Sequence, residues 1–400
     1  MVSRPIDTAL LGALACITAW MSFDPVLSPN GDNAEFILAG RDILTGSYTS
    51  NRFPAGWPAV LALIQGLGGG LIAMKLFVVV CFVALVCVVT WFHAWQPAAA
   101  IAVCAPMLSY STYVMAEIPF ALASTLCLLV VRRKGKWWIV ASVCLCLSGL
   151  FKSQALALGL ALAVFYKNPK WLLPLIPSFA FRTSAYAEEL LWLGSGFPER
   201  IINNLIYYFG TAFPEALIPI PNITTALGFL VLGYAVWKMK LGIQIYFGLY
   251  LGMVMIWPDG WKDTRFIVPL LPVVFIALPK QALYALMVIG GLFVPPKAVS
   301  GGIHWAHYYD AAIWAKTNTP DSAVVAARKP HNVEVLSERE SFRWSLTGPM
   351  DLSRADYVLL DPIFTSSINR VYPYLVENKW VPVFATPQPA QCIVFKRPNL

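Results

Sequence analysis

The segment LIAMKLFVVVCFVALVCVVTWF (residues 71–92) decides the fold class, because it is one long apolar run with a single charged residue, Lys75. A helix of roughly 17–25 apolar residues is long enough to cross the hydrocarbon core of a bilayer. The composition agrees with this interpretation: 58% of the residues are hydrophobic, 12% are charged and the mean hydropathy is +0.64. The sequence therefore predicts a polytopic α-helical membrane protein.

Similar apolar runs recur from the N-terminus to about residue 295 and predict about eleven transmembrane helices. The first run lacks a small-residue cleavage site after it, so we interpret it as a retained span rather than a signal peptide. The predicted spans are residues 6–23, 71–92, 97–114, 118–131, 137–151, 154–166, 171–187, 220–237, 241–257, 265–279 and 281–295.

The basic residues predict the orientation of these spans. With the N-terminus in the cytoplasm, the inner loops hold ten basic residues and one acid, Asp7, whereas eleven acids of the first 299 residues face outward. We therefore expect an integral protein of a bacterial inner or plasma membrane. The formal net charge of +8 reflects this orientation and gives no reason to expect a nucleic-acid partner.

The character of the chain changes after Pro295-Pro296. Residues 300–400 carry ten basic and nine acidic residues, with a helical pattern at 311–316 and short buried strands at 323–327, 357–361 and 392–396. We predict a transmembrane domain over 1–299, with a first outer loop at 24–70, and a small soluble α/β domain over 300–400. An odd number of spans makes that second domain extracytoplasmic.

The first outer loop contains DPVLSPNGDNAEFILAGRDILTGSYTSNRFPAGWP (residues 24–58), which is rich in acids, arginines and aromatic residues. Asp32 and Glu35 stand at the start of an apolar period that predicts a short helix along the membrane surface. Asp32, which follows Pro29-Asn30-Gly31, is the best-placed carboxylate to deprotonate an acceptor hydroxyl.

Further charged residues are predicted to lie on the same outer face. Glu117 is a second candidate catalytic acid, with Glu35 as a third. Cations at the membrane surface are suited to hold the phosphate of a lipid-linked substrate and to stabilise it as a leaving group. The candidate substrate-binding residues are Arg52, Lys75, Lys152, Lys262 and Arg265.

Each of these residues also has a structural interpretation. Asp32 could cap the helix that follows it, and Lys152 could extend along the interface with its charge in water. Glu117 could be a solvated residue at the end of a span, and Arg265 could pair with Asp259 or Asp263. No His- or Cys-rich metal spacing occurs; two outer acids could share a divalent cation, but their spacing does not require one.

Several segments in order carry a family resemblance: NGDNAEFILAGRDILTG (30–46) with RFPAGWPAVLAL (52–63), LSYSTYVMAEIPFALAS (108–124), KSQALALGLALAVF (152–165) and DTRFIVPLLPVVF (263–275). Together with AAIWAKTNTPDSAVVAARKP (311–330) and DYVLLDP (356–362), they resemble the GT-C glycosyltransferases, which include the protein mannosyltransferases and the lipid A aminoarabinose transferase. The resemblance implies sugar transfer from a polyprenyl-phosphate carrier, usually with inversion, at the outer leaflet. By carry-over, Asp32 would be the base, Glu117 the second-loop acid, and Lys152 and Arg265 candidates to contact the carrier phosphate or nearby loops.

The chain departs from the family pattern at three places. Asp32 and Glu35 are separated by two residues instead of forming an adjacent Asp-Glu, Phe266 replaces the usual Tyr after Arg265, and the second-loop acid is Glu. We predict an inverting glycosyltransferase that uses a lipid, glycan or protein acceptor. The alternatives are a transporter or flippase of a lipid-linked sugar, which would place charges near the bilayer midplane, and a non-catalytic scaffold subunit. The sequence encodes neither the sugar, the acceptor, the carrier length nor the oligomeric state.

Overall fold

The structure is a computed structural model that describes residues 4–29, 31–48, 53–180, 197–220, 224–257, 262–292, 302–345, 350–364, 367–389 and 391–398. The chain divides into two compact units. The first comprises residues 1–23 and 43–297, and the second comprises residues 24–42 and 298–400. Residues 24–42 thus cluster with the C-terminal residues, whereas the sequence places them with the transmembrane domain.

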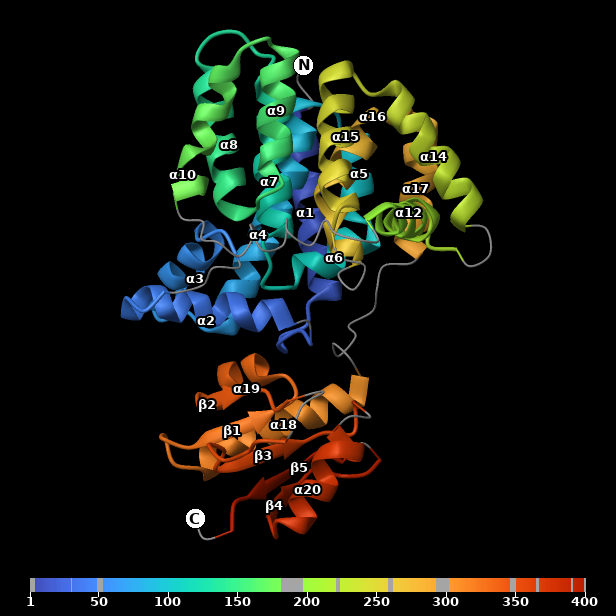
Figure 1. Ribbon diagram of the computed structural model, residues 1–400. Coiled ribbons are helices and arrows are strands. Elements are labelled where there is room, and N and C mark those ends of the chain that lie inside the picture. Colours follow the sequence, from blue (N-terminus) through green and yellow to red (C-terminus); the bar gives the residue numbers. More distant parts are fainter. Residues whose placement is uncertain are drawn as a thin grey trace. The chain divides into compact units, whose positions relative to one another are not determined.

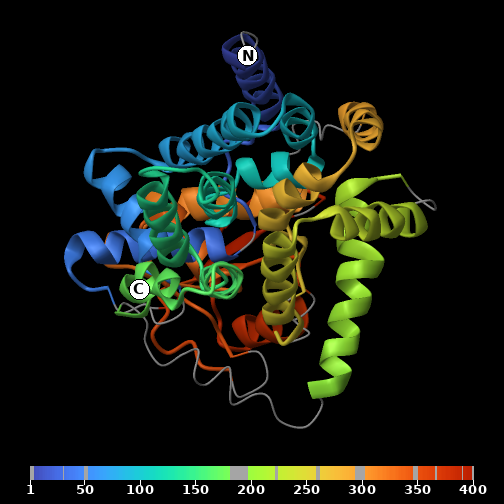
Figure 2. The same cartoon turned by 90° about the horizontal axis from the view of Figure 1, so that it is seen from above.

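The first unit is helical (Figure 1). Its elements are α1 (Arg4–Ser22), α3 (Gly56–Gly66), α4 (Leu71–Phe92), α5 (Trp95–Ala102), α6 (Ala105–Ser111), α7 (Glu117–Val130), α8 (Trp137–Phe151), α9 (Ala155–Phe165), η1 (Pro169–Leu175), α10 (Ile176–Ala180), α12 (Phe197–Tyr207), η2 (Tyr208–Ala212), α13 (Phe213–Leu217), α14 (Thr224–Lys238), α15 (Leu241–Met255), η4 (Thr264–Phe266), η5 (Val268–Leu270), α16 (Leu271–Ala277) and α17 (Lys280–Leu292). Figure 2 shows α12 and α14 to one side of α8 and α9.

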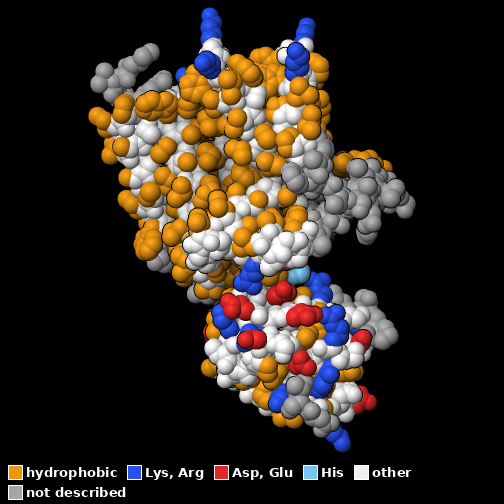
Figure 3. Space-filling view, turned by 90° about the vertical axis from the view of Figure 1, so that its left-hand side faces the viewer, with side chains coloured by type: hydrophobic (Ala, Val, Ile, Leu, Met, Phe, Trp, Pro, Cys, Tyr) orange, Lys and Arg blue, Asp and Glu red, His pale blue; other side chains and the backbone are white. Residues whose placement is uncertain are grey.

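Two described helices, α1 over Pro5–Ser22 and α4, are long and apolar enough to cross a membrane, and six shorter apolar helices of 10–17 residues accompany them. Large apolar side chains such as Trp20, Val80, Leu230 and Val288 are 63–67% exposed. Figure 3 shows hydrophobic side chains over most of the visible face of this unit. Exposed apolar surface on this scale fits a lipid environment. The helical class is therefore confirmed, while the count of eleven spans and the orientation of the termini stay predictions.

Prolines divide two of the predicted spans. The span predicted at 97–114 forms two helices, α5 and α6. The break between them includes Cys104, and Pro106 lies in the first turn of α6. The span predicted at 265–279 forms the short turns η4 and η5 before α16, with Pro269 and Pro272 at helix starts. A proline lacks the N–H that would continue a preceding helix, so each apolar run becomes several short helices.

Cationic loops meet at one end of the helical unit. Arg132, Lys238 and Lys240 line one cavity of about 260 Å³, together with His93 at the end of α4. Glu117 begins α7 and therefore lies about 20 Å away along that helix axis, given its 14 residues. The acid and the basic loops thus occupy opposite ends of α7.

A close approach of two helices requires glycine at one position. A Cβ atom on Gly56 would lie 2.5 Å from the Cβ of Leu150 and 2.6 Å from its carbonyl oxygen. Gly56 opens α3, so this contact sets α3 directly against the end of α8. The next residue, Trp57, is fully buried, and its ring packs edge-on against Phe151 at 6.2 Å.

The second unit is built on a five-stranded sheet of order β2-β1-β3-β5-β4. Its elements are α18 (Gly302–Asn318), β1 (Val324–Ala327), α19 (Pro330–Ser337), β2 (Glu340–Phe342), β3 (Tyr357–Leu360), η6 (Ser367–Val371), α20 (Tyr372–Glu377), β4 (Val381–Ala385) and β5 (Ile393–Lys396). Strands β2, β1 and β3 are parallel, whereas β5 and β4 are antiparallel to their neighbours. This sheet confirms the small C-terminal α/β unit and its three predicted strands; β2 and β4 were not predicted.

Helix α2 (Gly31–Thr45) begins in the second unit. This confirms the helix predicted from the apolar period of the first loop, which starts beside Asp32. Because α2 begins at Gly31, Asp32 lies inside the first turn, where a carboxylate is favoured by the positive end of the helix dipole.

Candidate active site

A buried ion pair joins two of the residues singled out in the sequence. The Lys152 Nζ donates to Glu117 Oε1 at 2.6 Å, and the two side chains are 10% and 3% exposed. Glu117 opens α7 and Lys152 follows the last residue of α8, so the antiparallel packing of α7 and α8 brings them together. The second carboxylate oxygen of Glu117 is buried with no hydrogen-bond partner among the described residues. Lys152 is therefore neutralised inside the protein and does not extend into water.

An aromatic ring links this pair to Arg265. The Phe266 ring centroid lies 5.4 Å from the Lys152 Nζ and 4.7 Å from the Arg265 guanidinium carbon. Two cations on one ring form cation–π contacts, which are stronger where water is excluded. Phe266, at the position where the family pattern has Tyr, was not predicted as a site residue, although the sequence signals it as the residue after Arg265.

Asp263 organises the turn that carries Arg265. Its Oδ1 accepts a hydrogen bond from the Arg265 backbone N–H at 2.9 Å and another from the Tyr110 hydroxyl at 2.7 Å. Its Oδ2 lies 3.7 Å from the Arg265 Nε. The pairing of Arg265 with Asp263, one of the structural alternatives, is thus present. Tyr110 was missed because the sequence alone does not bring residue 110 to residue 263.

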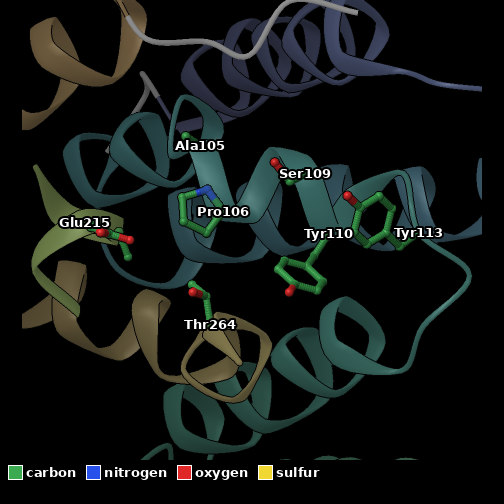
Figure 4. A pocket seen from close by; sticks show the side chains of 8 residues that line it. Ala105, Pro106, Ser109, Tyr110, Tyr113, Glu215 and Thr264 are labelled. Carbon is green, nitrogen blue, oxygen red and sulfur yellow. The ribbon is translucent and has the colours of Figure 1, made fainter. Parts of the chain in front are cut away.

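A pocket of about 330 Å³ opens beside Tyr110 (Figure 4). Ser109, Tyr113, Glu215 and Thr264 contribute polar groups to its lining, and Ala105, Pro106 and Ala216 complete it. Figure 4 shows Glu215 and Thr264 on segments different from the helix that carries Ser109 and Tyr110. The pocket thus combines a carboxylate, hydroxyls and aromatic rings, which are the groups that bind sugar hydroxyls and ring faces.

The other candidate cations take different positions. Lys75 is fully buried in α4 at 0% exposure, and Lys262 is half-buried just before η4. Arg52 lies outside the described residues. A buried lysine requires compensation of its charge by the groups around it.

Asp32 and Glu35 belong to the second unit, where α2 contacts α19. The Glu35 carboxylate lies 3.9 Å from the His331 Nε2. The Arg41 guanidinium donates to the Val335 carbonyl at 3.3 Å, and the Asn332 amide donates to the Ser28 carbonyl at 3.3 Å. The structure therefore brings the first-loop acids together with α19, a contact that no sequence pattern indicated.

Within the described ranges, no group of three or more His, Cys, Asp or Glu side chains is arranged to hold a metal ion.

The helical unit and the C-terminal α/β unit together resemble the fold of solved ArnT structures. No protein-family model matches the sequence, and no curated protein matches it. Among solved structures, the chain is similar to ArnT from Cupriavidus metallidurans bound to undecaprenyl phosphate, with a TM-score of 0.60, 13% identity, and coverage of 99% of this chain and 98% of that one. The apo state of the same ArnT matches with a TM-score of 0.61 and 13% identity over 97% of each chain.

Proposed function

We propose that this chain is an integral-membrane glycosyltransferase that moves a sugar from a polyprenyl-phosphate carrier to an acceptor hydroxyl on the outer face of the membrane. The single observation that carries the proposal is the likeness over 99% of the chain to ArnT bound to undecaprenyl phosphate. The buried cations of the first unit support it, since phosphate is the ligand that lysine and arginine hold best in such surroundings.

The proposed reaction is a single inverting displacement. The acceptor oxygen forms a bond to the anomeric carbon as the bond from that carbon to the carrier phosphate breaks. The acceptor proton passes to Asp32, and the bonding electrons leave with polyprenyl phosphate. Lys75 and Arg265 would stabilise the negative charge that develops on the leaving phosphate. The pocket beside Tyr110 would hold part of the donor or acceptor sugar.

The Glu117–Lys152 pair has a different part in this proposal. Lys152 is paired with Glu117 at 2.6 Å, so its charge is compensated within the protein. We assign Lys152 and Glu117 to positioning Phe266, and through it the guanidinium of Arg265.

The test is release of undecaprenyl phosphate from a synthetic undecaprenyl-phosphate sugar by the purified protein in lipid nanodiscs. We expect Arg265→Gln to reduce release about 10²–10³-fold, the usual effect of removing one donor to a developing negative charge. The matched control is Lys280→Gln, an exposed cation at the start of α17. Binding of the lipid-linked sugar without release would contradict the proposal and favour a transporter.

A further inference from the structure

Three cations stand at one edge of the sheet in the second unit. Arg328 and Lys329 directly follow β1, and Arg343 directly follows β2. Because β1 and β2 are parallel, their carboxyl ends meet at the same edge. No sequence pattern indicated that these residues lie together.

The strand order distinguishes this edge, because the connections leave β1 in opposite directions. The chain runs from β1 through α19 to β2 on one side, and then crosses to β3 on the other side of β1. Both neighbours of β1 are parallel to it. This reversal of direction is a topological switch point, and ligands of open α/β sheets bind in the crevice outside the carboxyl ends of the strands at such points.

Arg328 and Lys329 are half-buried and Arg343 is exposed, and all three lack ion pairs in the described part of the chain. Among the described residues, none of them lies within ion-pair distance of a carboxylate. The Arg328 guanidinium carbon lies 4.9 Å from the Phe364 ring centroid, and its Nε is buried without a hydrogen-bond partner. Lys316, in the same unit, is in contrast paired with Glu338 at 2.7 Å.

The charges act on one another. Burial lowers the pKa of Lys329, and the nearby guanidinium groups of Arg343 and Arg328 lower it further. Burial and Arg343 likewise lower the pKa of Arg328, while the buried carboxylate of Asp361, directly after β3, acts in the opposite sense and more weakly. Asp32 and Glu35 act on Lys329 in the opposite sense, but more weakly than either arginine. The cations therefore outweigh the carboxylates at this point, and an arriving anion would relieve the repulsion.

The backbone at this edge is held in place. The Tyr308 hydroxyl, on α18, donates to the Lys329 carbonyl and accepts from the Lys329 N–H, each at 3.2 Å. Helix α19 begins at the next residue, Pro330, so the positive end of its dipole adds to the three side-chain charges. The backbone of Lys329 is thus held in place before any ligand arrives, which lowers the entropic cost of binding.

We infer that the second unit binds a phosphate group at the carboxyl edge of β1, through Arg328, Lys329 and Arg343. Two guanidinium groups and one ammonium match the charge of a phosphate monoester better than that of a carboxylate. Asp32 lies in the same unit, so the bound molecule is presented on the body that carries the proposed base. The phosphate belongs to the lipid carrier or to the acceptor, and both have the chemistry that this site recognises.

The experiment measures binding of glycerol 3-phosphate to the full-length protein in phosphatidylcholine nanodiscs. We expect the double variant Lys329→Gln/Arg343→Gln to weaken binding at least about tenfold, since each lost contact is a charge-assisted hydrogen bond. The matched control is Arg354→Gln, which removes a cation of the same unit before the amino end of β3, where it pairs with Glu340. Unchanged affinity in the double variant, or equal loss in the control, would overturn the inference.

Two further arms make the result specific. The variant Lys329→Arg/Arg343→Lys keeps the charges and should retain binding, which separates loss of the site from loss of the fold. Competition by undecaprenyl phosphate would assign the site to the carrier, and binding without competition would assign it to a phosphate of the acceptor. No sugar transfer is measured, so failure here is distinct from failure of the proposed transferase.

Discussion

The two units surround a lysine with charges of opposite sign. Lys152 of the first unit is paired with Glu117 at 2.6 Å, whereas Lys329 of the second unit has two arginines as its strongest charged neighbours. A paired lysine stabilises one arrangement of helices and gives little to a ligand. An unpaired lysine among like charges lowers the stability of the fold, and binding of an anion restores it. The difference teaches that burial of a charge does not by itself identify a binding residue; the charges around it do.

The largest change in stability should come from breaking the Lys152–Glu117 ion pair. Lys152→Met leaves the Glu117 carboxylate buried without its partner, and removing one member of a buried pair costs about 3–5 kcal/mol. Thermal unfolding of the purified protein should therefore shift to much lower temperature. The double variant Lys152→Met/Glu117→Leu should recover most of the loss, while Lys316→Met, which breaks an exposed pair, should change little. Equal loss in the single and double variants would show that the pair is not the cause.

A smaller effect is expected at Tyr110, which fixes Asp263 from the neighbouring α6. Tyr110→Phe removes the 2.7 Å hydrogen bond to the Asp263 carboxylate, and a hydrogen bond to a charged group contributes about 1.5–3 kcal/mol. The pocket should keep its shape because only one oxygen is lost. We expect a lower unfolding temperature and a raised KM for the lipid-linked sugar, with Tyr284→Phe on the exposed face of α17 as control. An unchanged KM would show that the pocket does not bind the lipid-linked sugar.

The smallest expected effect is a gain in stability rather than a loss. The pKa of Lys329 is lower in the folded than in the unfolded chain, so the unfolded chain binds more protons and stability rises with pH across the interval between the two values. Lys329→Met removes this cost and should slightly raise the unfolding temperature at neutral pH, because solvent screens a half-buried charge. The gain should fade as the pH rises through the ordinary lysine pKa near 10.5. A destabilised variant at neutral pH would mean that Lys329 is held by attractive contacts.

The sequence predicted several helices and strands but not which segments pack against one another. The predicted span at 71–92 coincides with α4, and three of the five strands were predicted because their residues form short apolar runs. Strand β2 was missed because Glu340–Phe342 is short and polar, and β4 because Pro382 interrupts its pattern. Helix patterns indicate burial but contain no information on which distant segment covers them.

The same limit applies to the candidate site. Glu117 and Lys152 were each selected for their position at the end of an apolar run, but their pairing depends on the antiparallel packing of α7 and α8. The contact of α2 with α19 joins residues about 300 positions apart, for example Arg41 with Val335. The switch-point cations were missed because Arg328 and Arg343 meet only once the strand order is known.

The most direct test of the account is release of polyprenyl phosphate from a synthetic polyprenyl-phosphate sugar by the wild-type protein and by Asp32→Asn, with an acceptor-bearing membrane extract present. Loss of a general base lowers the rate by about 10²–10⁴-fold, so we predict release and sugar transfer by the wild type and almost none by the variant. Transfer by Asp32→Asn at near the wild-type rate would contradict the assignment of the base. Absence of release by the wild type, despite tight binding of the lipid-linked sugar, would contradict the transferase itself.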